Sequence, residues 1–288
     1  MEEIVDKIRD SLPALALTGA GVSTASGIPT YRNHSGVWQR SDPITHQEFT
    51  QRHDKRQRYW GRSMRGWPAV RAARPNPAHR HLAELESKGA VTQIVTQNVD
   101  RLHQRAGSDT AIDLHGRLDR VVCLSCGSFS SRDDLQARLL HLNPRIHQAA
   151  TDIHPDGDAD IDEALIPDMK IANCMSCGGT LMPDVVFFGG SIPAERVQRC
   201  KAALESAGSL LVVGSSLQVY SGFRFCRWAQ AMNKPIFLIN PGKSRADDLG
   251  LRWPVNADAG LKQLLNSLTQ TGECVTRPGD SDDKPIKD

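Results

Sequence analysis

The sequence has no long hydrophobic run, and this absence excludes one broad class of protein. A membrane-spanning helix needs roughly 20 consecutive apolar residues, and no run in these 288 residues approaches that length. The start, Met1-Glu2-Glu3, also lacks the basic and apolar regions of a secretory signal and the arginine-rich character of an organelle transit peptide. We therefore expect a cytoplasmic protein, or one supplied without its leader, that has no membrane partner.

An excess of one charge is also absent. The chain has 35 lysines and arginines against 33 aspartates and glutamates, which gives a formal net charge of +2. This balance favours neither a nucleic-acid nor a protein partner, and no specific nucleic acid is expected. The length suits one large domain, alone or with a smaller satellite.

Cysteine is scarce, but its spacing is informative. Four of the seven cysteines form two Cys-x-x-Cys pairs, Cys123 with Cys126 and Cys174 with Cys177. In a reducing compartment this pattern favours a metal site over disulfides. Four thiolates complete a tetrahedral zinc shell and leave no position open for water, so the predicted zinc is structural, with one ion per chain.

Other interpretations of the cysteines stay open at this point. The two pairs could be unliganded thiols, redox groups, or part of a zinc ribbon that binds nucleic acid, although few basic residues surround them. Cys200 and Cys226 lie in helix-like segments and are predicted to be small core residues, while Cys274 stands alone.

The apolar segments predict a doubly wound α/β fold with a parallel sheet. Apolar runs typical of buried strands alternate with helix-like segments such as 77–88 and 194–206. Polar or glycine-rich residues follow every run, and ligands of such sheets bind at the carboxyl ends of the strands. We therefore expect a single crevice at that edge. The five runs are residues 14–17, 91–96, 111–114, 209–213 and 235–239.

Two insertions interrupt this fold. Residues 33–76 are polar and arginine-rich and are predicted to form a helical module over the crevice. Residues 117–183 hold both cysteine pairs and are predicted to form a small zinc-ribbon domain, with a long loop at 143–168. Residues 276–288 are polar and are predicted to be a disordered tail. The Rossmann-like domain itself would comprise residues 1–32, 77–116 and 184–275.

The first apolar run leads into a glycine loop that departs from the usual dinucleotide pattern. Gly19 and Gly21 would let the backbone approach a diphosphate, with amide dipoles at the start of a following helix binding the anion. Thr24 stands where the third glycine of Gly-x-Gly-x-x-Gly would be, so a hydride-transferring dehydrogenase is a poor fit. The segment then continues into an aromatic and cationic pair, Tyr31 and Arg32. Taken alone, the loop could also be a plain turn.

Later strand ends carry groups suited to catalysis. Residues 97–100, Gln-Asn-Val-Asp, could hold a ribose, a water and a carboxamide, with helix capping by Asp100 as the alternative. His115 follows a strand and precedes a glycine that leaves room beside its imidazole, a group suited to proton transfer near neutral pH. Residues 183–190 predict either a core strand or an edge that accepts an extended peptide.

Together these motifs resemble those of the sirtuins, the Sir2 family. The glycine segment 18–32, the Gln-Asn-Val-Asp loop, Leu-His-Gly at 114–116, the two cysteine pairs and the motifs at 183–189, 214–216 and 240 occur in the order found in that family. The resemblance covers nearly the whole chain. Four shorter segments, 56–60, 75–79, 155–158 and 215–222, look closest to the class II branch, that of mitochondrial sirtuin-4. The missing leader suggests a bacterial member.

The resemblance implies a protein-lysine deacylase that consumes NAD as a co-substrate and holds one structural zinc. Its products would be nicotinamide, O-acyl-ADP-ribose and free lysine. His115 would be the general base that activates a ribose hydroxyl, and Asn98 would position a water. The residues that the resemblance assigns to NAD are Gly19, Ala20, Gly21, Ser23, Ile28, Pro29, Tyr31, Arg32, Gln97, Asn98, Val99, Asp100, Gly214, Ser215, Ser216, Asn240, Pro241, Gly242 and Ala259.

The partners would be acylated-lysine proteins or peptides, and the acyl group is left open. Tyr59-x-x-Arg62 is similar to a pair with which some sirtuins bind the distal carboxylate of succinyl or malonyl lysine, although a solvated helix face is the alternative. Two rival functions remain: a mono-ADP-ribosyltransferase that uses the same NAD site, and a non-enzymatic NAD- and zinc-binding module. The segment assigned to the substrate comprises Val185, Val186, Phe187, Phe188 and Gly189.

Overall fold

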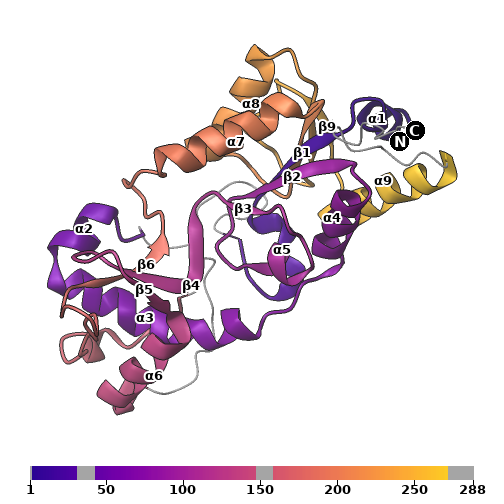
Figure 1. Ribbon diagram of the computed structural model, residues 1–288. Helices are drawn as coiled ribbons and strands as arrows, with labels where there is room; N and C mark the ends of the chain where they lie inside the picture. The colour runs from indigo at the N-terminus through magenta and orange to yellow at the C-terminus, as the bar shows by residue number, and fades with distance from the viewer. Residues whose placement is uncertain (1, 31–42, 147–157, 272–288) are drawn as a thin grey trace, which may run out of the picture.

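The computed structural model describes residues 2–30, 43–146 and 158–271, which form two lobes (Figure 1). The larger lobe is built on a six-stranded, wholly parallel sheet of strand order β3-β2-β1-β7-β8-β9. The strands are β1 (Ala14–Thr18), β2 (Val91–Thr96), β3 (Ile112–Asp113), β7 (Ser209–Val213), β8 (Ile236–Ile239) and β9 (Leu251–Trp253).

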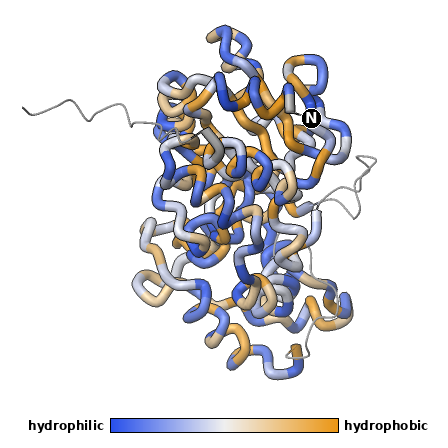
Figure 2. Tube along the Cα trace, turned by 90° about the vertical axis from the view of Figure 1, so that its right-hand side faces the viewer, coloured by the Kyte–Doolittle hydropathy of each residue, from blue (hydrophilic) through white to orange (hydrophobic). Residues whose placement is uncertain are grey.

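The central strands are apolar on both sides because helices cover both faces of the sheet. Successive side chains of a strand point to opposite faces, and Ala14 and Ala16 belong to one hydrophobic cluster while Leu15 and Leu17 belong to another. This double burial explains why β1 and β7 are continuous apolar runs with every residue buried. Figure 2 shows this interior as a largely hydrophobic band inside the upper lobe.

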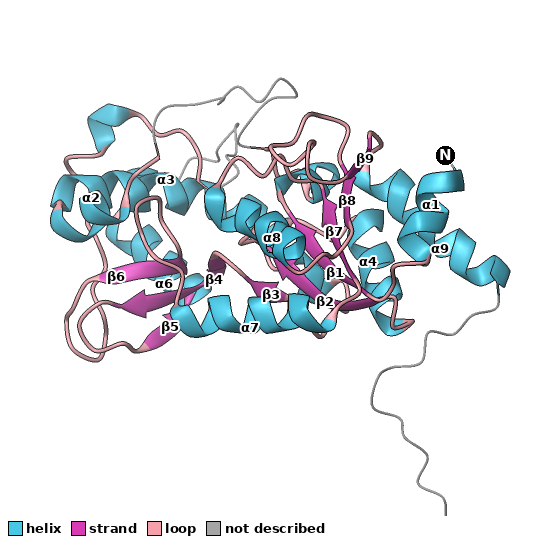
Figure 3. Ribbon diagram, turned by 90° about the horizontal axis from the view of Figure 1, so that it is seen from above, coloured by secondary structure: helices cyan, strands magenta, loops and turns pink. Residues whose placement is uncertain are grey.

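Helices lie on both faces of this sheet (Figure 3). The first cluster joins the sheet to α1 (Glu2–Arg9), α4 (Pro77–Ser87) and α9 (Ala257–Thr271). The second joins it to α7 (Ala194–Ser206) and α8 (Tyr220–Ala231), and α5 (Leu102–Arg105) is a single turn after β2. Asn76 fixes the start of α4, because its side chain caps the helix in a capping box and Pro77 follows at the first helical position.

The smaller lobe holds a three-stranded antiparallel sheet of order β5-β4-β6. Its strands are β4 (Gly116–Cys123), β5 (Phe129–Ser131) and β6 (Leu181–Val185), and its helices are α2 (His46–Gln51), α3 (His53–Ala72) and α6 (Arg132–Leu142). One hydrophobic cluster includes Trp60 of α3, Val121 of β4 and Leu135 of α6. The segments 33–76 and 117–183 therefore share a core where they are described, and their division into separate domains stays a prediction.

The predicted α/β fold is confirmed, with three local differences. β9 was not predicted, because three residues with an arginine at the centre give no apolar run. The helix expected after the glycine loop is absent, and two single 3-10 turns, Ala20–Val22 and Thr24–Ser26, occupy its place before Gly27 with φ of +84°. The expected loop 143–168 contains further 3-10 turns at Pro144–Ile146 and Glu163–Leu165.

Two further predictions have different outcomes. Cys200 and Cys226 are fully buried, and burial raises the pKa of their thiols to about 11 and about 12, so their assignment as inert core residues is confirmed. The predicted tail 276–288 and Cys274 lie outside the described residues. In the part of the chain that the structure describes, no helix has the length and apolar character required to span a membrane.

Candidate active site

A cleft of about 1370 Å³ is lined by both lobes. Its larger-lobe side is formed by loops that follow β1, β2, β7 and β8, at the carboxyl edge of the sheet. The strand order reverses between β1 and β7, and this is where doubly wound sheets bind ligands. Its other side is formed by α3 and by the segment after β6 in the smaller lobe.

Two glycine loops meet at this reversal point. The amide of Gly21 donates to the carbonyl oxygen of Gly214 at 2.9 Å, and the amide of Gly19 donates to Val213 at 3.1 Å. A Cβ on Gly21 would lie 2.8 Å from the same Gly214 oxygen, so no side chain fits there. The amides of Gly19 and Gly21 thus have acceptors within the protein, and the predicted binding of a diphosphate at this loop stays a prediction.

Gln97 joins the two loops. Its side-chain amide donates to the carbonyl oxygen of Thr18 at 3.1 Å and to Oγ of Ser215 at 2.9 Å. Asn98 next to it is buried and donates to the carbonyl oxygen of Gly19 and to Oγ of Ser23, both at 3.1 Å. The Gln-Asn pair therefore fixes the ends of three strands relative to one another.

Asp100 lies behind the wall of the cleft. It accepts a hydrogen bond from Oγ of Ser23 at 2.7 Å, and burial raises the pKa of this carboxyl group above its usual value. Its second oxygen accepts from the amide of Leu102 at 2.9 Å, so the capping role considered as an alternative is also present. Ser23, Ile28 and Asp100 line no part of the cleft in this conformation.

His115 stands in the cleft with both ring nitrogens engaged. Nδ1 lies 3.0 Å from the carbonyl oxygen of Gln97, and Nε2 lies 2.7 Å from Oγ of Ser221. Burial lowers the pKa of His115 to about 4, and the nearby charges of Arg196 and Arg224 act in the same direction. The imidazole is therefore neutral at physiological pH, as a general base has to be.

The segment after β6 forms the opposite wall. The amide of Val186 donates to the carbonyl oxygen of His115 at 2.8 Å, which holds this segment next to His115. Phe188 pairs with Thr45 in a parallel bridge, and its ring is 39% exposed. Residues 181–185 are a strand at one edge of the three-stranded sheet, and residues 185–189 line the cleft. The role of this segment in accepting an extended peptide stays a prediction.

Tyr59 and Arg62 also line the cleft, so a solvated helix face is the wrong reading for them. Tyr59 is 6% exposed and packs edge-on against Phe187, with ring centroids 5.3 Å apart. Nε of Arg62 lies 2.9 Å from Oδ2 of Asp158, and both side chains are largely buried. Asp158 comes from the segment between the cysteine pairs, where its polar sequence predicted only a loop.

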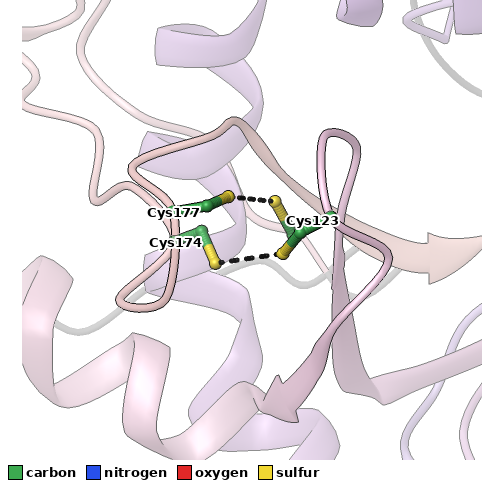
Figure 4. Close-up of side chains that lie close together, drawn as sticks. Cys123, Cys174 and Cys177 are labelled. Atoms are coloured by element: carbon green, nitrogen blue, oxygen red, sulfur yellow. Dashed lines mark hydrogen bonds between the residues drawn. The ribbon is translucent and has the colours of Figure 1, made fainter.

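The four paired cysteines converge on one point in the smaller lobe. Their sulfur atoms all lie within 4.8 Å of one another, and Figure 4 draws the cluster with Cys123, Cys174 and Cys177 labelled. Two sulfur-sulfur distances are 3.5 Å for Cys123 with Cys177 and 3.8 Å for Cys126 with Cys174. A tetrahedron of Zn–S bonds of about 2.3 Å has edges of about 3.8 Å. The donor set and its spacing therefore fit a structural zinc ion.

The structure brings most of the predicted NAD-site residues to the cleft. Tyr31 and Arg32 lie outside the described residues. Arg224, Ser221 and Asp158 also line the cleft and were not predicted as site residues. The segments containing Ser221 and Asp158 were singled out only for their resemblance to the class II branch, and no pattern marked Arg224. The predicted residues that do line it are Gly19, Ala20, Gly21, Pro29, Gln97, Asn98, Val99, His115, Gly214, Ser215, Ser216, Asn240, Pro241, Gly242 and Ala259, with Tyr59, Arg62 and residues 185–189.

Two glycine loops at the reversal point of a parallel sheet, beside a half-buried neutral imidazole, are typical of a nucleotide-dependent enzyme. Residues 19–221 match the Sir2 family, and the chain belongs to that family. It is similar to NAD-dependent protein deacetylase 1 of Streptomyces coelicolor, with 47% identity over 85% of this chain and 83% of that protein. The NAD-dependent protein deacetylase of Bordetella bronchiseptica is 51% identical, over 87% of this chain and 92% of its own length.

A relative with a different name and two solved structures extend this comparison. NAD-dependent protein deacylase SIR4 of Monosiga brevicollis is 48% identical over 88% of this chain and 85% of that protein. A Sir2 homologue solved as its NAD complex is 29% identical, with a TM-score of 0.72, over 94% of each chain. Sir2 solved with a p53 peptide and NAD+ is 26% identical, with a TM-score of 0.70, over 94% of this chain and 98% of that one.

Proposed function

We propose that this chain is an NAD-dependent protein-lysine deacylase with His115 as its general base. One observation carries the proposal: a neutral, half-buried imidazole stands where the glycine loops of the sheet face the wall formed by residues 185–189. A dinucleotide on one side and an extended acyl-lysine peptide on the other would meet at this ring. Relatives named deacetylases and deacylases at about half identity support the same activity.

Several residues of the chain would have separate roles in the proposed deacylation. When bound, NAD would supply an electrophilic ribose carbon, to which the acyl oxygen would bond as the bond to nicotinamide breaks. Gln97 and Asn98 would hold the loop ends around the ribose. Nε2 of His115 would then take the proton of a ribose hydroxyl as that oxygen bonds to the acyl carbon, and water would replace the departing lysine amine. The amide of Val186 donates a hydrogen bond to the carbonyl oxygen of His115, so the wall formed by residues 185–189 would lie at a fixed distance from the base.

The zinc would have a structural role. It would cross-link the two cysteine knuckles of the smaller lobe, which shares a core with α3 and so supports one wall of the cleft. No step of the reaction passes through it, since four sulfur ligands leave no position for water or substrate.

We infer that the acyl end of the cleft favours uncharged acyl groups. Arg62 already has Asp158 within 2.9 Å, and Arg58 has Glu163 within 3.2 Å, so carboxylates of the protein accompany both guanidinium groups. A succinyl carboxylate would have to compete with Asp158 for Arg62. Tyr59 and Phe187 offer an aromatic surface beside this pair, which suits acetyl and longer apolar acyl chains.

We further propose that the chain belongs to the class II branch of the family, comes from a bacterium and is located in the cytoplasm. The similarity to a relative named SIR4 supports the branch, and several bacterial relatives near 50% identity support the source. No contact on the described residues favours mono-ADP-ribosyl transfer over deacylation.

The proposal is tested by the dependence of nicotinamide release on both substrates. The protein is incubated with NAD and either an acetyl-lysine peptide or the same peptide with free lysine. We expect nicotinamide release only with the acylated peptide, and no label from adenine-labelled NAD on the protein. Equal release with both peptides, or labelled protein without peptide deacylation, would contradict the proposal.

A further inference from the structure

The cleft-facing nitrogen of His115 is occupied by a hydroxyl that the reaction itself does not require. The carbonyl oxygen of Gln97 can only accept a hydrogen bond, so Nδ1, 3.0 Å away, carries the proton of the neutral ring. Nε2 is then the acceptor, and Oγ of Ser221 lies 2.7 Å from it. The hydroxyl of Ser221 therefore donates to the same nitrogen that would take up a proton during deacylation.

Ser221 reaches this position because the first turn of α8 packs closely on Gln97. The next residue, Gly222, is buried, and a Cβ there would collide with the side-chain amide of Gln97. The backbone carbonyl of the same Gln97 holds Nδ1 of His115. Both partners of the imidazole therefore belong to one packed unit, and neither can shift without moving the other.

This arrangement fixes the plane and the tautomer of the ring. A neutral imidazole held at one nitrogen alone can still tilt about that hydrogen bond, and its free lone pair then points away from a fixed substrate. A second bond, opposite the first, removes that freedom. The low pKa of His115 keeps its ring neutral. The protein therefore has to fix only the orientation and the tautomer of the ring.

Building on the proposed deacylase function, we propose that Ser221 is a positioning residue for His115. In the ligand-free protein its hydroxyl holds Nε2 in the plane and tautomer that accept a proton, and it yields this place to the ribose hydroxyl of NAD. Rotation about the Cα–Cβ bond of serine is enough for that exchange, so α8 need not move. Ser221 gains and loses no proton in the net reaction.

The test uses two substitutions of the same shape, Ser221→Thr and Ser221→Val. Threonine keeps a hydroxyl and valine replaces it by a methyl group, so steric effects on α8 are matched. We expect kcat/KM for NAD of the valine variant to be about tenfold below that of the threonine variant, with kcat unchanged within about twofold, because the hydroxyl holds the ring only before NAD takes its place. Gln230→Ala, on the exposed side of the last turn of α8, controls for general effects on this helix. Equal kcat/KM for threonine and valine would overturn the proposal.

A spectroscopic measurement tests the same role without any turnover. The 15N chemical shifts of the His115 ring report its tautomer in the ligand-free protein. We expect a single Nδ1–H tautomer in the wild type and the threonine variant, and a broadened or mixed signal in the valine variant. A valine variant with the wild-type signal would overturn the positioning role. If the wild type does not deacylate at all, the proposed function fails, while the ring signals still decide the role of Ser221.

Discussion

The imidazole of His115 is held by the carbonyl oxygen of Gln97 and the hydroxyl of Ser221, and desolvation of the ring lowers its pKa and keeps it neutral. Its position after a strand and before a glycine predicted a base at the sheet edge. Gly116 has a φ of +88°, and a Cβ there would collide with the backbone at Asp184, so glycine is required beside the base. The contact with Ser221 could not be predicted, since it joins residues 106 positions apart.

The protonation of His115 gives the first prediction. Burial places its pKa near 4, below the usual value of 6.5, so the ring should stay neutral as the pH falls from 8 to 5.5. An NMR titration of the His115 ring, assigned by its loss in His115→Ala, should show no protonation shift in this range. A titration midpoint near 6.5 would show that burial does not lower the pKa of the His115 ring.

The pairing of Arg62 with Asp158 gives a second prediction. Asp158→Asn removes the nearer of two carboxylates beside Arg62, the other being Asp160 at 3.8 Å, and keeps the side-chain shape, so a succinyl carboxylate gains access to Arg62. The ratio of kcat/KM for succinyl over acetyl peptides should rise about tenfold, which corresponds to about 1.4 kcal/mol. Asp168→Asn, which removes the same charge from an exposed position of the neighbouring segment, should leave the ratio unchanged. An unaltered ratio in both variants would show that Asp158 does not set acyl preference.

Among the elements, the strands were the most predictable and the contacts between segments the least. Burial on both faces favours apolar residues at nearly every position, so the runs 14–17 and 209–213 could be recognised as strands from the sequence. Asp158 and Arg62 lie 96 residues apart, and neither position carries a local pattern that would pair them. The cysteine pairs are the exception, because their spacing alone predicted a convergence of sulfur atoms that the structure contains.

The contact between the loops after β1 and β7 gives a third prediction. In Gly21→Ala the new Cβ would meet backbone atoms of Gly214 at 2.8 to 3.1 Å, and backbone cannot rotate away as a side chain can. We expect the loops to separate, with unfolding free energy lowered by about 1–3 kcal/mol and NAD binding weakened at least tenfold. Gly107→Ala is the control, because it carries the strain of a positive φ but meets no atom within 4 Å. Calorimetric titration with NAD that finds wild-type affinity in Gly21→Ala would refute this role.

The cysteine module gives a fourth prediction. Removing zinc with a chelator leaves four thiols without the ion that joins the two knuckles, so the smaller lobe should lose its protection from hydrogen exchange first. The parallel sheet has its own two cores and should remain protected. Metal analysis of the untreated protein should find one zinc per chain. A metal-free protein with unchanged exchange and full activity would disprove the structural role.

At the scale of the whole molecule, both lobes line the cleft, and each contributes a different kind of surface to it. The parallel sheet contributes rigid loop ends for a dinucleotide, and the smaller lobe contributes a wall of extended backbone and aromatic rings. His115 belongs to the connection between them, since β4 of the smaller lobe starts at the residue that follows it. This placement puts the base where the two substrates would meet.

The most direct test of this account is the product stoichiometry of a single turnover with NAD and an acetyl-lysine peptide. Mass spectrometry should find nicotinamide, free-lysine peptide and O-acetyl-ADP-ribose in equal amounts from the wild type. His115→Ala, folded by its circular dichroism spectrum, should reduce formation of the last two by at least a hundredfold. Nicotinamide without O-acetyl-ADP-ribose, or a folded His115→Ala variant with full yield, would contradict the assignment of this cleft to acyl transfer.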